Sequence, residues 1–279
     1  LRHRRHALPH AGRLLSSPWR SAPDFIILGA MKAGTTSLYQ YLQAHPAVIG
    51  AFRKELHFFD REGLFGQNHY RAYFPARRTL RAASDDPRRR AVTGESTPYY
   101  LFHPLVAKRI RRRVPRVKLI ALLRDPIERA LSHYRFEVAR ELEPLSLEDA
   151  FNAEADRTAR PAGQSLGKHY ASFHVFHHSY LARGYYAEQL ARYYDLFPAE
   201  QILVLKFEEF FASPEHEFPR VLRFLDLPAW RPPGDFKRFN PGRGHAELTR
   251  QLRRQLERHF APHNRALREL TGQHITWGY

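Results

Sequence analysis

The stretch that decides the fold is Phe25-Ile26-Ile27-Leu28-Gly29-Ala30-Met31-Lys32-Ala33-Gly34-Thr35-Thr36-Ser37. An apolar run of strand length leads into a glycine-bounded turn, and a helix-forming segment follows. The Gly29-x4-Gly34 spacing is that of the phosphate loop G-x-x-x-x-G-K-[ST], but Thr35 occupies the position of the lysine that binds a triphosphate. Backbone N–H groups and the helix dipole still favour an anion there. The stretch therefore predicts a nucleotide site for a reaction other than ATP hydrolysis.

Strand and helix patterns alternate along the rest of the chain. We expect strands at 25–28, 47–51, 117–123 and 201–206, and helices at 36–44, 103–113 and 180–196, with further helices beginning near 126, 146, 214 and 247. This alternation predicts a single α/β domain, with a central, mostly parallel sheet flanked by helices and a phosphate-loop-like nucleotide-binding core. The domain is expected to span 23–279, and 1–22 to form a basic, flexible N-terminal arm. Ligands are expected at the carboxyl ends of the strands.

Composition limits the class of protein and its partners. The chain has 279 residues, of which 43% are hydrophobic, so it can build a substantial core despite a formal net charge of +17. Such a basic surface favours an anionic ligand or polymer, with nucleic acid and membrane headgroups as rival explanations. No apolar run approaches the ~18 residues of a membrane span. The absence of Cys favours a reducing, cytoplasmic location, with the Golgi lumen as the alternative if an anchor upstream of Leu1 was removed.

Two motifs resemble those of one enzyme family. The segment 32–37 resembles the 5′-phosphosulfate loop of sulfotransferases that use 3′-phosphoadenosine 5′-phosphosulfate (PAPS), and Lys54-Glu55-Leu56-His57-Phe58-Phe59-Asp60 is similar to the signature of their carbohydrate branch, which includes the heparan sulfate sulfotransferases and bacterial relatives. The resemblance extends from about Pro23 to Tyr279. It implies PAPS as donor, adenosine 3′,5′-bisphosphate (PAP) as product, a hydroxyl acceptor, most often on a carbohydrate, and no metal.

The resemblance also assigns catalytic residues. Glu55 matches the family's catalytic Glu, so it is expected to act as the general base that takes the acceptor proton. His57 is the alternative base, or else it packs beside its aromatic neighbours. Lys32 is expected to neutralise the charge that grows on the oxygen bridging sulfate and phosphate. Lys54 and Asp60 are expected to orient the acceptor. The competing interpretation is that Glu55 forms only a surface ion pair with Lys54 or Arg53.

Donor binding is expected to involve four segments. The 5′-phosphosulfate would be held, together with Lys32, by Ala33, Gly34, Thr35, Thr36 and Ser37. Arg124 and Ser132 match the family's 3′-phosphate clamp in Arg-Asp-Pro-x-x-Arg-x-x-Ser, where a guanidinium gives bidentate contact and a hydroxyl adds one bond. Tyr186 and Arg243 lie in segments that resemble those around the family's nucleotide. The alternative interpretation is that Arg124 is a surface charge that binds no nucleotide.

Two features that suggest a metal have better explanations. Asp125, after the strand 117–123, could be taken for a Mg²⁺ ligand, but Asp125-Pro126-x-Glu128 fits a helix start. The cluster His174, His177 and His178 has no carboxylate or Cys at ligand spacing, so no metal site is expected.

One departure from the family pattern concerns the acceptor. Where heparan sulfate relatives have a Lys in the segment corresponding to 95–98, this chain has Ser96, which puts heparan-type specificity in doubt. Two other functions remain as alternatives. A phosphate-loop kinase or NTPase is disfavoured by Thr35, and a nucleic-acid-binding protein is supported by charge alone, without a recognised reader motif.

Overall fold

The computed structural model describes residues 12–61, 66–84, 90–232, 236, 247–273, 275 and 277–279. Its strands are β1 (Phe25–Gly29), β2 (Gly94–Ser96), β3 (Lys118–Leu123) and β4 (Ile202–Lys206). Its described helices, with short 3₁₀ turns marked η, are η2 (Ser17–Trp19), α2 (Thr35–Ala44), α3 (Gln67–Arg71), α4 (Arg77–Ala82), α5 (Val106–Arg113), α6 (Pro126–Val138), α7 (Leu147–Asn152), α8 (Glu154–Arg157), α9 (Leu166–Tyr170), α10 (Phe173–His178), η3 (Ala182–Gly184), α11 (Tyr186–Tyr194), η4 (Ala199–Gln201), α12 (Phe207–Ala212), α13 (Pro214–Phe224) and α14 (Arg250–Thr271).

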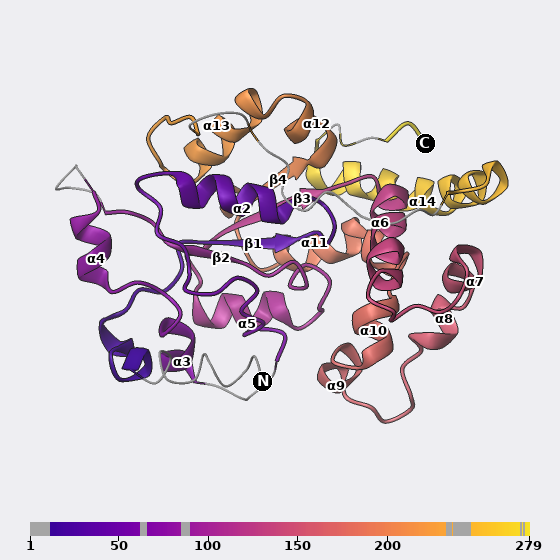
Figure 1. Ribbon diagram of the computed structural model, residues 1–279, viewed down its shortest axis with the longest axis horizontal. Helices are drawn as coiled ribbons and strands as arrows, with labels where there is room; N and C mark the ends of the chain where they lie inside the picture. Colours follow the sequence, from indigo (N-terminus) through magenta and orange to yellow (C-terminus); the bar gives the residue numbers. More distant parts are fainter. Residues whose placement is uncertain are drawn as a thin grey trace.

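The four strands form one parallel sheet in the order β2-β1-β3-β4. Phe25 and Ile27 pack on one face with α2, α12 and α13, whereas Ile26 and Leu28 pack on the other with α5 and α11. Figure 1 shows these two helical layers above and below the sheet. β1, β3 and β4 read as continuous apolar runs, which is why their positions were visible in the sequence, whereas β2, Gly94-Glu95-Ser96, has no such run and was not predicted. The predicted α/β domain with a mostly parallel sheet is confirmed.

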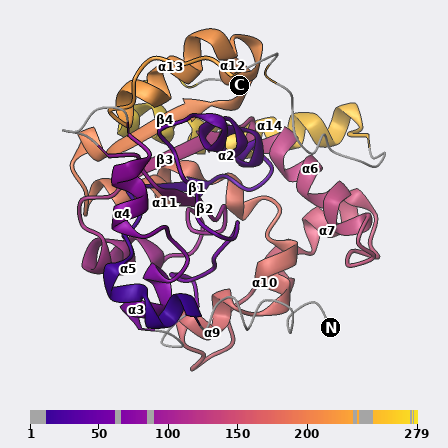
Figure 2. The same ribbon diagram turned by 60° about the vertical axis from the view of Figure 1, so that its left-hand side comes forward.

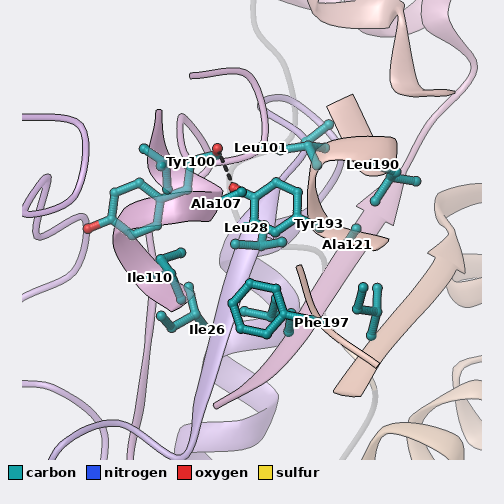
Figure 3. Packing of buried hydrophobic residues seen from close by; sticks show 14 of the residues in the cluster. Ile26, Leu28, Tyr100, Leu101, Ala107, Ile110, Ala121, Leu190, Tyr193 and Phe197 are labelled. Carbon is teal, nitrogen blue, oxygen red and sulfur yellow. Dashed lines mark hydrogen bonds between the residues drawn. The ribbon is translucent and has the colours of Figure 1, made fainter. Parts of the chain in front are cut away.

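The layer beneath the sheet contains an aromatic core. Figure 3 shows Tyr193 and Phe197 packed against the strand residues Ile26 and Leu28, with Tyr193 donating a hydrogen bond to the carbonyl of Tyr100. The donor–acceptor distance is 2.6 Å. Because this bond satisfies a buried hydroxyl, it fixes the segment after β2 against α11.

The segment 47–51 differs from the expected second strand. Val48 forms an isolated bridge with Val92, and the carbonyls of Val92 and Gly94 accept from Ile49 and Ala51. The next carbonyl of this row, that of Ser96, accepts from Glu55 instead of residue 53. Two extra residues therefore loop out. The regular ladder ends before residues 54–60, the predicted catalytic segment, begin.

Three helices begin later than the sequence predicted. The helix expected from 103 is α5, which begins at Val106. The segment 180–196 contains the 3₁₀ turn η3 before α11, and Gly184 in that turn packs so closely that a Cβ there would lie 2.7 Å from Phe260. The basic helix expected from 247 begins at Arg250, after Thr249 caps it by accepting from the N–H of Leu252.

Part of the expected N-terminal arm packs on the domain. The Arg13 guanidinium donates to the carbonyls of Ala72 and Phe74, and Arg20 also donates to the carbonyl of Phe74. Arg20 additionally pairs with Ala76 in an isolated bridge. The described part of this segment, 12–22, therefore contacts the region around α3 and α4.

A group of short helices extends the domain beside the sheet. Figures 1 and 2 both show α7 beside α6, with α10 below α6 and α9 further down at the edge of the molecule. The ring of Phe176, in α10, lies 5.9 Å from that of His57. This group therefore forms one border of the catalytic segment.

Candidate active site

The carboxyl ends of the parallel strands collect the polar residues that the sequence analysis singled out. Lys32 follows β1, and Arg124 follows β3. The Arg124 guanidinium donates to the carbonyl of Lys32 at 3.2 Å. The Glu55 N–H meets the last residue of β2 through the carbonyl of Ser96, at 3.2 Å. Three separate segments thus converge at the edge where parallel sheets bind their ligands.

The phosphate loop places the start of α2 at this edge. Gly34 caps the helix with φ of 81°, and a Cβ at this position would lie 2.4 Å from the ring of Phe211. Glycine is therefore required both by the backbone conformation and by the close approach. The first N–H groups of α2, from Thr35 onward, lack helical acceptors and provide the expected anion cradle. Of the three hydroxyl side chains here, Thr36 is partly exposed, while Thr35 and Ser37 are buried.

Lys32 is held beside this cradle in a desolvated position. Its ammonium lies 4.2 Å from the centre of the Phe136 ring, in cation–π geometry. Burial lowers the pKa of Lys32, and the nearby positive charge of Arg124 lowers it further. A partly desolvated cation interacts more strongly with an anion than a hydrated one does. This arrangement suits stabilisation of negative charge at the loop.

Arg124 is fixed from several directions. Its guanidinium stacks on Phe207 at 4.9 Å, and its carbonyl accepts from the Tyr186 hydroxyl at 2.8 Å. Ser132 is partly exposed on α6, which Asp125 caps by accepting from two backbone N–H groups. The predicted capping role of Asp125 is confirmed. Tyr186 itself is buried, so in this structure it positions Arg124, and Arg243 lies outside the described residues.

The catalytic segment meets the phosphate loop through a direct contact. The Lys54 ammonium donates to the Thr36 hydroxyl and also lies 3.5 Å from the Glu55 carboxylate. Burial lowers the pKa of Lys54, and Glu55 opposes that shift. The Glu55 side chain is 47% exposed, which leaves its carboxylate accessible from solvent. A basic group and an accessible carboxylate are therefore held next to the anion cradle.

His57 and Asp60 form a pair on the inner side of Glu55. The imidazole Nδ1 lies 2.7 Å from Asp60 Oδ2, and Nε2 lies 4.0 Å from Glu55 Oε2. The Asp60 side chain is buried, with its second oxygen lacking a hydrogen-bond partner among the described residues. Asp60 was expected to orient the acceptor, and in the structure its carboxylate contacts the His57 imidazole. Such a carboxylate fixes the orientation of an imidazole.

Several residues around the site had no role in the sequence analysis. Phe136 contacts Lys32 from α6, and a helical position of this kind carries no motif. Glu95, Thr97 and Tyr100 lie beneath the catalytic segment, and Thr97 and Tyr100 accept backbone N–H bonds from it. Their signal was an acid followed by hydroxyl residues at a strand end. Ser96 is fully buried, so the position where relatives have a Lys contacts Glu55 through its backbone.

The histidine cluster is occupied by protein partners. His174 and His178 contact each other, His178 also contacts Arg157, and His177 contacts Glu137. No grouping of three or more potential metal-ligating side chains occurs within the described residues. None of the described helices is both long enough and apolar enough to span a membrane.

Comparisons with known proteins agree with this geometry. A family model described as "Sulfotransferase domain" matches residues 22–238. The chain is 26% identical to the membrane-associated sulfotransferase kil1 of Dictyostelium discoideum, over 97% of this chain and 68% of that protein. It is 30% identical to human heparan sulfate glucosamine 3-O-sulfotransferase 6, over 95% and 77% respectively.

A solved structure extends the agreement to the fold. The crystal structure of a sulfotransferase from Alicyclobacillus acidocaldarius is 31% identical, with a TM-score of 0.69 over 91% of this chain and 98% of that one. Together with the anion cradle at β1 and the catalytic segment beside β2, the family match over most of the chain leads to one conclusion: this protein belongs to the sulfotransferase family and is an enzyme of that family.

Proposed function

We propose that this enzyme takes the sulfuryl group from PAPS and transfers it to a hydroxyl of a carbohydrate. The observation that carries the proposal is the contact between Lys54 and the Thr36 hydroxyl, which joins the catalytic segment to the phosphate loop. Glu55 is adjacent to Lys54 and accessible, so a base stands at the border of the predicted sulfate position.

The residues at the strand ends suit this donor. Gly34 lets the loop turn into α2 beneath the Phe211 ring, and the N–H groups at the start of that helix favour a bound phosphate. Lys32 and Thr36 would hold the 5′ side, and Arg124 with Ser132 would hold the 3′-phosphate. Tyr186 supports that clamp by binding the Arg124 carbonyl. The bound donor supplies an activated sulfuryl group and departs as PAP.

The chain's own groups then carry out an in-line displacement. The acceptor oxygen forms a bond to sulfur while its proton passes to the Glu55 carboxylate. The bond from sulfur to the bridging oxygen breaks, and its electron pair remains on the 5′-phosphate. The Lys32 ammonium stabilises the charge that develops there. Proton, electron pair and leaving group are thus accounted for without a further reactant.

His57 supports Glu55 in this scheme. Asp60 holds Nδ1, so Nε2 is directed toward the side of Glu55. Because the Nδ1–H donates to Asp60, Nε2 of the neutral imidazole is a hydrogen-bond acceptor, and it would orient the hydroxyl of the bound acceptor. Glu55 remains the base because it is the more exposed of the two groups, with 47% of its side chain accessible against 15% for His57.

A carbohydrate acceptor is supported by the relatives and by the charge. Among the relatives, the human enzyme is named for a heparan sulfate glucosamine. The formal charge of +17 would favour a polyanionic chain. Buried Ser96 cannot replace a Lys side chain in contacting an acceptor, so we limit the proposal to carbohydrate hydroxyls as a class.

Two measurements test the proposal. Calorimetric titrations with PAP, ATP–Mg²⁺ and an oligonucleotide should give tight binding for PAP alone. Transfer of labelled sulfate from PAPS should then be assayed on sugars, polysaccharides, phenols and lipids, and we expect product on a carbohydrate. Tighter binding of ATP–Mg²⁺ or the oligonucleotide would refute the donor assignment, and transfer confined to phenols or lipids would refute the acceptor class.

A further inference from the structure

A fully buried carboxylate lies under the catalytic segment. Glu95, in β2, has no exposed surface and receives hydrogen bonds from three hydroxyls. Tyr70 donates to Oε1 at 2.5 Å, Thr97 donates to Oε2 at 2.7 Å, and Tyr100 approaches Oε1 at 3.4 Å. A buried charge is tolerated when such donors surround it.

Two of these hydroxyls also hold the backbone of the catalytic segment. The N–H of Leu56 donates to Thr97 Oγ1 at 3.1 Å, and the N–H of Phe58 donates to Tyr100 Oη at 2.9 Å. A hydroxyl has one proton to donate and lone pairs to accept with. Because each hydroxyl donates its hydrogen bond to Glu95, the lone pairs of that hydroxyl are left to accept from the N–H groups of the catalytic segment. The carboxylate thereby determines that both hydroxyls act as hydrogen-bond acceptors toward the segment.

The anchored residues alternate with the functional ones. Leu56 and Phe58, whose N–H groups are held by the two hydroxyls, alternate with Glu55 and His57, whose side chains are 47% and 15% exposed. Both Glu55 and His57 have left-handed backbone angles, with φ of 55° and 50°. Such angles cost about 1–3 kcal/mol each in a residue other than glycine, so the surrounding contacts must impose them.

We propose that Glu95 is a positioning residue for catalysis. Through Thr97 and Tyr100 it fixes the backbone angles that present Glu55 and His57 to the acceptor. The inference rests on the proposed function of Glu55 as base. It assigns no contact with donor or acceptor to Glu95, which is sealed from solvent.

The protonation state of Glu95 is consistent with this role. Burial raises the pKa of Glu95 to about 7, against the opposing hydrogen bonds from Tyr70 and Thr97. Asp60 raises this pKa further, and His57 lowers it. A protonated Glu95 would itself donate, so one of the hydroxyls that now donate to it would have to accept instead and turn its own proton elsewhere. The ionised form matches the observed donors.

The test compares two substitutions at Thr97 with Glu95→Gln. Thr97→Val keeps the shape but removes the hydroxyl, whereas Thr97→Ser keeps it. We expect Thr97→Val and Glu95→Gln to lower kcat, measured per PAP-binding site, at least tenfold while the Kd for PAP stays within twofold. Thr97→Ser should retain at least half of the wild-type kcat. Counting PAP-binding sites corrects for any unfolded fraction.

A remote hydroxyl provides the matched control. Tyr134→Phe removes a hydrogen bond to the carbonyl of Leu145 and should lower stability without lowering kcat. Amide hydrogen exchange at 56–59, which needs no acceptor, should accelerate in Thr97→Val but not in Tyr134→Phe. A Thr97→Val variant with wild-type kcat, or with unchanged exchange, would overturn the inference. Failure of the wild type to transfer sulfate would instead refute the proposed function, and the exchange result would still decide the positioning role.

Discussion

The phosphate loop and the catalytic segment meet at Thr36 and Lys54, but they are built in different ways. The phosphate loop has a glycine at its left-handed cap, Gly34, and presents backbone N–H groups at a helix N-terminus. The catalytic segment has left-handed angles at Glu55 and His57 and is held by hydroxyls from the segment after β2. The conformation of the phosphate loop follows from residues within the loop itself. The conformation of the catalytic segment depends on side chains from residues far away along the chain.

The largest expected effect separates these two regions by kinetics. Glu55→Gln keeps the shape of the side chain and removes its basicity, so kcat should fall about 10²-fold or more with donor affinity nearly intact. Lys32→Ala removes charge from the phosphate loop, so it should lower kcat and weaken PAP binding together. Steady-state kinetics and PAP calorimetry on both variants provide the measurement.

The outcome that would contradict this division is specific. If Glu55→Gln retained wild-type turnover while His57→Ala were inactive, the base would be His57. The geometry allows such a result, because Asp60 holds His57 in the manner of an oriented base. The sulfotransferase assignment would be unaffected, since it rests on the family match.

A second prediction concerns the phosphate side alone. Charge-assisted bonds from Arg124 and Ser132 to a 3′-phosphate are worth about 1.5–3 kcal/mol each. The wild type should therefore bind PAP at least tenfold more tightly than adenosine 5′-monophosphate, and Arg124→Ala should largely erase that preference. Calorimetry with the two nucleotides measures it. Equal wild-type affinities would refute the clamp.

The contrast also explains what could be predicted from the sequence. β1, β3, β4 and the capped helix after Asp125 were recognisable because apolar runs and caps are local patterns. The break in hydrogen bonding after Ala51 could not be predicted, because it depends on where the segment 47–55 stops following the carbonyls of the β2 region. The burial of Asp60 and the support from Glu95 depend on tertiary contacts, which the acid and hydroxyl residues at the end of β2 do not by themselves specify.

A third prediction sharpens the role of the buried support. The folded-state pKa of Glu95, about 7, is raised from its ordinary value of 4.5. Between these pH values the folded protein holds a proton that the unfolded chain releases, so this group lowers the free energy of unfolding as pH rises. Glu95→Gln lacks the effect. The stability of wild type relative to Glu95→Gln should decrease by about 3 kcal/mol between pH 4.5 and pH 8.

Urea denaturation of both proteins at the two pH values measures this difference. Other buried acids with raised pKa values, such as Glu137 and Glu154, cancel because both proteins contain them. A difference that stayed constant, or that changed in favour of wild type at high pH, would show that Glu95 is not a buried group titrating near neutrality.

The smallest expected effect comes from Ser96, which lies beside Glu95 but contacts the catalytic segment through its backbone. Its carbonyl accepts from the Glu55 N–H, and its buried Oγ has no hydrogen-bond partner among the described residues. Ser96→Ala keeps the carbonyl and removes a hydroxyl that was desolvated without compensation. We therefore expect unchanged kcat and a free energy of unfolding that is unchanged or up to about 1 kcal/mol higher. Assay and urea denaturation check both values. A tenfold loss of kcat in Ser96→Ala would mean that the hydroxyl acts on the segment directly, and that neighbouring side chain would then share the role assigned to Thr97.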